Sequence, residues 1–145
     1  MDVPGLHIVF DAADPERLSR FWMAAMTGYD YPGGPPEGFA TWDEFADAHG
    51  IAVEQRNRSR TLVDTAGNRP DIFFNQVPGR AAGKNRLHLD IKVARGLEGD
   101  ERRSRIESEA ARIETAGGTI DERVDGPDGF WIVMQDIEGN VFCVI

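Results

Sequence analysis

The stretch that decides the fold is Lys84-Asn85-Arg86-Leu87-His88-Leu89-Asp90-Ile91-Lys92-Val93. Polar and apolar residues alternate along it, a pattern typical of a β-strand with one buried face. The apolar side chains are expected to point to one side, and the polar ones, His88 and Asp90 among them, to the other. The polar face is therefore either a solvated surface or the wall of a polar pocket.

The composition is that of an ordinary globular protein, with 41% hydrophobic and 28% charged residues in a chain of 145. This length suits a single domain over 1–145. The net charge of −9 argues against nucleic acid and anionic membranes as partners, because phosphate binding needs clustered cations. No apolar run approaches the roughly 20 residues of a membrane-spanning helix. The single cysteine, Cys143, cannot form an internal disulfide, and a cytoplasmic location is expected.

The first half of the chain predicts a strand, a helix and a hairpin. The alternating residues 6–11 form the strand, and Asp14-Pro15-Glu16 begins a helix that ends at Gly28. A loop over 29–38 and a short helix over 41–50, capped by Thr41 with Glu44, follow. Strands over 60–64 and 71–77 are then expected to pair around the turn at 65–70.

The second half repeats this order. After the strand at 84–93, a helix is predicted over 101–116, followed by strands over 119–124, 130–136 and 141–145. Leu6-His7-Ile8 and Leu87-His88-Leu89 open the two halves, with the two histidines 81 positions apart (88 − 7). Such a repeat implies two modules, about 5–78 and 84–145, that complete one another.

Four motifs, in this order and spacing, resemble the vicinal-oxygen-chelate superfamily, also called the glyoxalase/bleomycin-resistance/dihydroxybiphenyl-dioxygenase family. They are Phe21-Trp22, Asn85-Arg86-Leu87-His88-Leu89-Asp90, Ala116-Gly117-Gly118 and Asp136-Ile137-Glu138-Gly139-Asn140-Val141-Phe142-Cys143. The resemblance covers essentially the whole chain and is strongest to the glyoxalase-like domain group typical of actinobacteria. It implies an α+β fold of paired βαβββ modules, whose strands form a cup-like open sheet around a small-molecule cavity. It also implies a homodimer.

Metal-dependent members of this family hold a divalent ion with one ligand from each of four strands. The resemblance places two of these ligands at His7 and His88, and a third near Phe73 or Asn75. The enzymes carry a glutamate four residues after the turn glycine, where this chain has Cys143. Zinc, nickel, manganese or iron is the implied metal, and a thiolate suits zinc or another soft ion. The alternatives are two hydrogen-bonded histidines without metal, and a cysteine that serves only as a small apolar side chain.

Further candidates are side chains that share these strands. Asp90, two residues from His88, is a general base, a metal ligand or an orienting partner of His88, or else forms a salt bridge with Arg86 or Lys92. Arg86 either contacts an anionic ligand or only solvates the strand end. An aromatic wall with an amide suits a planar or heterocyclic ligand, and the candidates for this wall are Phe73, Asn75 and Trp131. Trp42 and Phe45 on the short helix form a lid, a dimer contact or ordinary packing.

Two functions follow from these residues. The first is a binding protein, like the antibiotic-sequestering members of the family, that holds an aromatic or heterocyclic molecule in the cup without glyoxalase I activity. The alternative is a metal-dependent lyase or isomerase that uses His7 and His88, with Asp90 and His88 as catalytic residues. The absent glutamate favours the first function, and the two histidines favour the second.

Overall fold

The computed structural model describes residues 5–79, 83 and 85–145. The chain divides into two compact units: one holds strands β1 to β4 and the other strands β5 to β8. Each unit contains one open, four-stranded mixed sheet, so the expected α+β class with two βαβββ repeats is confirmed. None of the helices in the described part of the chain is both long and apolar enough to cross a membrane.

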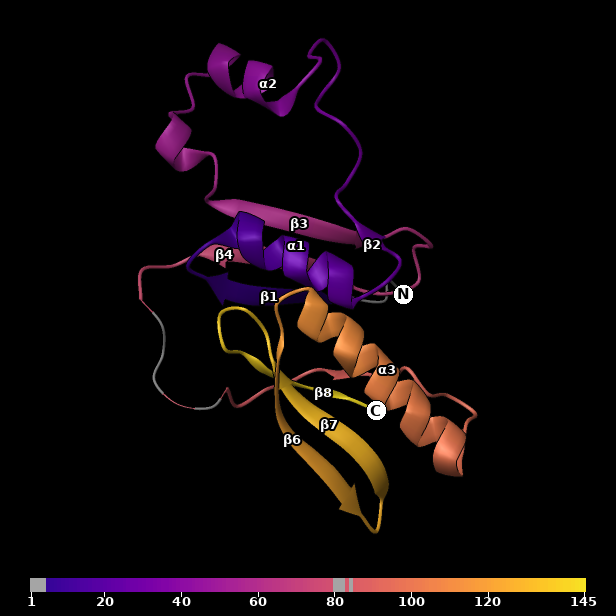
Figure 1. The fold of residues 1–145 in the computed structure, drawn as a ribbon. Coiled ribbons are helices and arrows are strands. Elements are labelled where there is room, and N and C mark those ends of the chain that lie inside the picture. Colours follow the sequence, from indigo (N-terminus) through magenta and orange to yellow (C-terminus); the bar gives the residue numbers. More distant parts are fainter. Residues whose placement is uncertain (1–4, 80–82, 84) are drawn as a thin grey trace. The chain divides into compact units, whose positions relative to one another are not determined.

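The first unit follows the order strand, helix and three strands, with an inserted helix before the last two strands (Figure 1). Its elements are β1 (His7–Ala12), α1 (Pro15–Ala25), β2 (Tyr29–Asp30), α2 (Trp42–Ala48), a 3-10 turn (Val53–Gln55), β3 (Ser59–Asp64) and β4 (Asp71–Gln76). The strands lie in the order β1-β4-β3-β2, with β1 parallel to β4 and β3 antiparallel to β4. The predicted hairpin of β3 and β4 is therefore confirmed.

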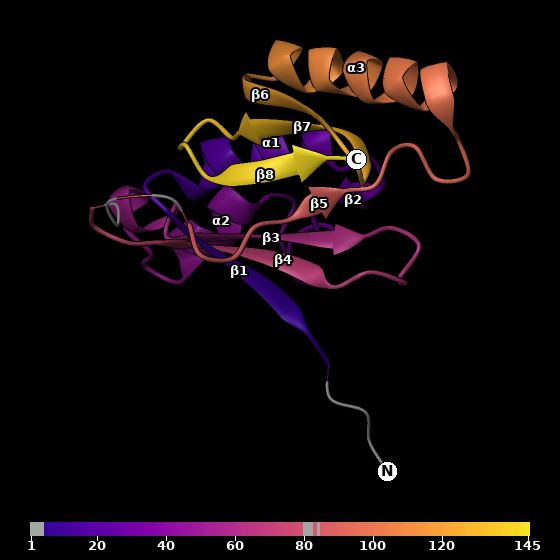
Figure 2. The ribbon, with the colours of Figure 1, turned by 90° about the horizontal axis from the view of Figure 1, so that it is seen from below.

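The second unit repeats this arrangement without an inserted helix. Its elements are β5 (Asp90–Ile91), α3 (Gly99–Thr115), β6 (Thr119–Gly126), β7 (Gly129–Gln135) and β8 (Val141–Val144). The strand order β5-β8-β7-β6, with β5 parallel to β8, matches that of the first unit. Helix α3 lies along one side of β6, β7 and β8 (Figure 2).

One face of each sheet forms the core of its unit. In the first unit, the ring of Phe10 on β1 packs against two other rings. Its centroid lies 5.0 Å from that of Trp22 on α1 and 5.4 Å from that of Phe74 on β4. In the second unit, Ile106 and Ile113 of α3 are fully buried, as are the alternate strand residues Ile132, Met134 and Val144. The opposite face of each sheet, here called the helix-free face, carries the intervening side chains.

Two expectations about strands are wrong. The segment 29–38 was expected to be entirely loop, but Tyr29–Asp30 forms β2, which pairs with β3; the buried Tyr29 also donates its hydroxyl hydrogen bond to the Pro70 carbonyl oxygen at 2.8 Å. The predicted strand over 84–93 is regular only at Asp90–Ile91; Lys84 lies outside the described residues. Leu87, expected to be buried, is 81% exposed.

The Asn85 side chain explains why the longer strand does not form. Its amide nitrogen donates to the Val141 carbonyl oxygen at 3.1 Å, and its Oδ1 accepts from the Val141 backbone nitrogen at 2.7 Å. A side chain thus makes the bonds to β8 that a regular strand would make with its backbone.

Candidate active site and metal centre

The candidate site lies on the helix-free face of the second sheet, where β5 runs beside β8. The Cys143 backbone nitrogen donates to the Leu89 carbonyl oxygen at 2.9 Å, and the Ile145 nitrogen donates to the Ile91 carbonyl oxygen at 2.9 Å. This register sets Asp90 directly opposite Cys143. Because residues opposite one another in a ladder point to the same face, the ladder itself brings the carboxylate beside the thiol.

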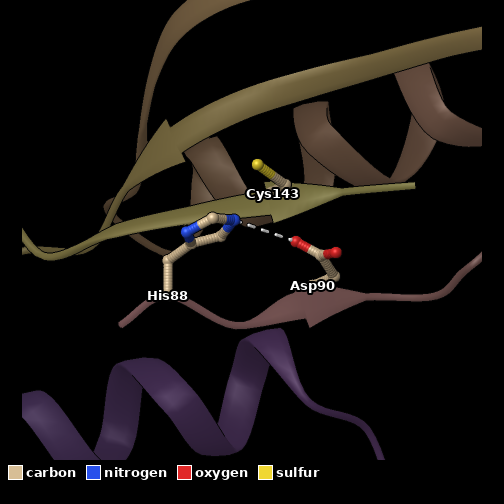
Figure 3. Close-up of side chains that lie close together, drawn as sticks. All are labelled: His88, Asp90 and Cys143. Carbon is tan, nitrogen blue, oxygen red and sulfur yellow. Dashed lines mark ion pairs between the residues drawn. The ribbon is translucent and has the colours of Figure 1, made fainter. Parts of the chain in front are cut away.

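His88 completes a cluster of three potential metal ligands with these two residues. Figure 3 shows His88 and Asp90 facing each other on the β5 segment, with Cys143 beside them on β8. The His88 Nε2 lies 3.4 Å from Asp90 Oδ1, and one donor atom from each of the three residues falls within 4.8 Å of the others. The His88 and Asp90 side chains are 43% and 44% exposed, whereas Cys143 is only 9% exposed.

The donor set of this cluster suits a borderline or soft divalent metal. Imidazole nitrogen, carboxylate oxygen and thiolate sulfur are all zinc ligands, and a thiolate disfavours hard ions such as Mg²⁺. Two of the three side chains are nearly half exposed and have room to adjust around an ion. The residues therefore fit a metal chemically, with coordination positions left for other groups.

The Asp90 carboxylate lies closest to His88 among the partners considered for it. Across the described residues 85–145, the Asp90 Oδ1 lies 3.4 Å from the His88 Nε2, and Asp90 forms no salt bridge with Arg86 or Lys92. Arg86 is exposed. The carboxylate is thus available to the cluster.

His7 lies in the first unit, on β1 opposite Asp71 of β4. Its Nε2 is 3.8 Å from Asp71 Oδ2, and its side chain is 66% exposed. The metal site predicted to combine His7 with His88 draws on both units and remains a prediction.

A short turn motif occurs once in each repeat. Matching the two copies shows which residue of the second repeat corresponds to His7. Asp-x-x-Gly-Asn occurs at 64–68 and at 136–140; in each copy the glycine nitrogen donates to the aspartate carbonyl oxygen at 2.9 Å, and the asparagine nitrogen donates to the aspartate carboxylate. Asp71 and Cys143 each lie seven residues after the first residue of the motif. Since His7 pairs with Asp71 and Asp90 pairs with Cys143, Asp90 is the counterpart of His7 by register.

The remaining candidates lie on helix-free faces. Phe73 and Asn75 alternate with the buried Phe74 on β4, and Phe73 lies opposite Val9 of β1. Trp131 lies opposite Val124 in the second sheet and is half-buried. These three positions therefore do not belong to the helix-covered core.

Sequence reasoning missed two neighbours of the cluster. Cys143 lies opposite Val133 of β7, which lies opposite Glu122 of β6, so one row crosses all four strands from Asp90 to Glu122. Simple alternation would have set Asp121 opposite Val133, but an irregularity between Ile120 and Glu122 shifts the register. Nothing in the local sequence signals this bulge.

Comparisons with known proteins agree with the fold. A family model described as a glyoxalase-like domain matches residues 7–145. No curated protein matches the chain.

Several solved structures share the fold at low sequence identity. A glyoxalase/bleomycin resistance protein/dioxygenase family enzyme from Burkholderia phytofirmans is 15% identical, with a TM-score of 0.62, covering 95% of this chain and 94% of that one. The fosfomycin resistance protein FosX of Listeria monocytogenes, a variant complexed with Mn(II) and a dihydroxypropylphosphonic acid, is 12% identical, with a TM-score of 0.62 and coverages of 99% and 90%. Lactoylglutathione lyase of Agrobacterium tumefaciens is 10% identical, with a TM-score of 0.56 and coverages of 99% and 93%.

The family match starts at the first residue of β1 and runs to the end of the chain, so it includes both βαβββ repeats and the His88, Asp90 and Cys143 cluster. The chain belongs to the glyoxalase-like domain family, and it shares its fold with a glyoxalase/bleomycin resistance protein/dioxygenase family enzyme.

Proposed function

We propose that this protein binds a divalent metal through His88, Asp90 and Cys143 and, beside it, a small organic molecule. The observation that carries the proposal is the approach of the three donor atoms to within 4.8 Å of one another on one face of the second sheet. Of the metals expected from the sequence, zinc suits the thiolate better than manganese does. When bound, the metal would supply a positive charge for two neighbouring oxygens of the ligand.

The surroundings of the cluster favour an aromatic or heterocyclic ligand. Val133, opposite Cys143, and Trp131, two residues before it, are half-buried on the same face as the cluster. An apolar platform beside a few polar groups is the usual composition of a small-molecule site. Arg86 and, in the first unit, His7, Phe73 and Asn75 remain candidates for contacting the ligand.

We propose further that the protein lacks glyoxalase I activity. Cys143 occupies the position at which the resemblance expects a metal-binding glutamate. A thiolate is a softer ligand than a carboxylate and does not reproduce its proton-accepting chemistry. The expected homodimer and cytoplasmic location belong to the same proposal.

The second candidate function is a metal-dependent lyase or isomerase. It is favoured by the contact between Asp90 and His88, because a carboxylate and an imidazole side by side can accept and return a proton at a substrate carbon. Asp90 would move the proton, and His88 would act as a ligand or as a neutral hydrogen-bond partner. Two of the solved structures that share the fold are described as a fosfomycin resistance protein and a lyase.

Elemental analysis of protein purified without a histidine tag tests the metal site. Near-stoichiometric zinc is expected in the wild type, with loss in His88→Ala, Asp90→Ala and Cys143→Ser and retention in the control His49→Ala. Retained metal in the Cys143 and Asp90 variants, with loss in His7→Ala, would replace this cluster by the ligand set predicted from the sequence.

The two functions are separated by following the ligand itself. Aromatic and heterocyclic compounds that raise the melting temperature are incubated with the metal-loaded protein, and the compound is recovered and analysed. Recovery of an unchanged compound indicates binding, and an altered compound that stays unchanged with Asp90→Asn indicates the enzyme.

A further inference from the structure

An inserted segment sets the first unit apart from the second. Residues 31–58, here called the α2 segment, lie between β2 and β3, whereas the corresponding strands β6 and β7 are joined by only residues 127 and 128. Figure 1 shows α2 standing away from the strands of its own unit. The segment therefore contributes little to covering the sheet.

The α2 segment presents a stripe of aromatic side chains. Trp42 and Phe45 of α2 and His49, which caps its end, are spaced three and four residues apart, as side chains on one helical face are. Their rings contact in sequence, with centroids 5.8 Å apart for Trp42 and Phe45 and 4.1 Å apart for Phe45 and His49. Trp42 is nevertheless 54% exposed.

Polar contacts hold this stripe in place. The Thr41 hydroxyl oxygen accepts from the Glu44 nitrogen at 3.1 Å and caps the helix. Arg56 bonds to the carboxylates of Asp43 and Asp47 and to the Ile51 carbonyl oxygen. An exposed tryptophan on an ordered helix is preorganised for binding, and tryptophan is the residue type most enriched at binding hot spots.

The charge of the segment defines the partner. It contains five carboxylates and two arginines, giving a net charge of −3 (−5 + 2); the carboxylates are Glu37, Asp43, Glu44, Asp47 and Glu54. A surface of this sign attracts a cationic partner. An isologous contact with a second copy would set the same carboxylates against one another.

The convex shape of the stripe favours a macromolecular partner over a small molecule. From Trp42 to His49 a helix rises about 10 Å, and its surface is convex. Small-molecule sites are concave, so this stripe suits an extended macromolecular surface better. We propose that the α2 segment is a docking surface for a basic amphipathic segment of a partner protein, with Trp42 as its anchor.

The test titrates the full-length protein with a synthetic amphipathic peptide of leucine and lysine, and with its leucine and glutamate counterpart, by calorimetry. The leucine and lysine peptide is expected to bind, and the leucine and glutamate peptide is not. Trp42→Ala should weaken this binding at least tenfold, and Glu37→Gln with Glu54→Gln should weaken it and lower its salt dependence. Leu87→Ala, which truncates an even more exposed apolar side chain in the other unit, is the control and should not change it.

Three results would overturn the proposal: no binding of the basic peptide, equal binding of both peptides, or unchanged affinity in Trp42→Ala. Sedimentation of the free protein supplies a fourth. A dimer that Trp42→Ala dissociates would assign the stripe to a second copy of the chain. Because neither Trp42 nor the two glutamates belong to the His88, Asp90 and Cys143 cluster, the outcome is independent of the metal site.

Discussion

Asp90 and Cys143 lie directly opposite each other on the parallel strands β5 and β8. Neighbouring strands are about 4.8 Å apart, so two same-face side chains at one level of the ladder are held within reach of a common ion. His88 joins them because it precedes Asp90 by two residues. Backbone pairing, rather than a loop, therefore positions two of the three proposed ligands.

Replacing the thiol by a carboxylate is expected to change the metal preference. Cys143→Glu substitutes a hard oxygen donor for a soft sulfur, so affinity for zinc relative to manganese should fall by about tenfold or more. Competition titrations of the metal-free protein with both ions measure this ratio. A ratio equal to that of the wild type would mean that Cys143 does not touch the metal.

The Asn85 side chain is expected to hold the segment that carries His88 against β8. Asn85→Ala removes its two bonds to Val141, which should lower the free energy of unfolding by about 1–3 kcal/mol and weaken zinc binding through His88. Chemical denaturation and metal titration measure the two effects. Asn75→Ala, at an exposed position on β4, is the control and should change stability by less than about 0.5 kcal/mol. Equal effects of the two substitutions would contradict this role.

Substitutions of two adjacent phenylalanines are expected to lower the stability to different extents. Phe74 is fully buried and stacks on Phe10, so Phe74→Ala should cost about 3–5 kcal/mol of unfolding free energy. Phe73 is half-buried on the helix-free face, and Phe73→Ala should cost clearly less. Urea denaturation of both variants compares them. A larger loss for Phe73→Ala would mean that the faces of β4 are assigned the wrong way round.

The buried turn residue Asp64 is expected to make stability depend on acid pH. Hydrogen bonds from the Arg69 guanidinium, at 2.6 and 3.0 Å, and from the Asn68 backbone nitrogen lower the pKa of Asp64 to about 2. The unfolded value is about 3.9, so the folded state binds fewer protons between these two values. The stability that Asp64 contributes is thus complete above about pH 4 and is lost as the pH falls toward about 2.

The comparison with Asp64→Asn checks this sign. At pH 7 the variant should be less stable than the wild type, and the difference should shrink steadily from about pH 4 to pH 2 in denaturation experiments. A difference that does not change over this range would show that the carboxylate charge of Asp64 is not what stabilises the turn.

Much of the fold was predictable because its signals are local. Short sequence patterns were enough to predict these elements. They are the alternation of residues in β7 and β4, the proline at the start of α1, and the glycines after α1 and α3. The predicted helix over 101–116 agrees with α3 at Gly99–Thr115. The Thr41 cap of α2 was also predicted, although Glu44 accepts from the Ala40 nitrogen rather than from that of Thr41.

The features that were not predictable depend on distant partners. Strand β2 has only two residues, and its partners in β3, Asp64 and Val63, lie far along the chain. The irregular path before β5 depends on Asn85 reaching Val141, 56 positions away.

The candidate site was predictable in its residue types but not in its grouping. His88, Asp90 and Cys143 were each singled out by alternation or by resemblance, whereas their proximity requires the register of β5 against β8. Glu122 was not singled out, because the bulge that turns it to the same face leaves no mark in the sequence.

The most direct test of the proposed metal site is the absorption spectrum of the protein loaded with cobalt(II), a spectroscopic substitute for zinc. Coordination by Cys143 predicts a thiolate-to-cobalt charge-transfer band in the near ultraviolet that is present in the wild type and in His49→Ala and absent in Cys143→Ser. A wild-type spectrum without this band, or an identical band in Cys143→Ser, would contradict the assignment of Cys143 as a metal ligand.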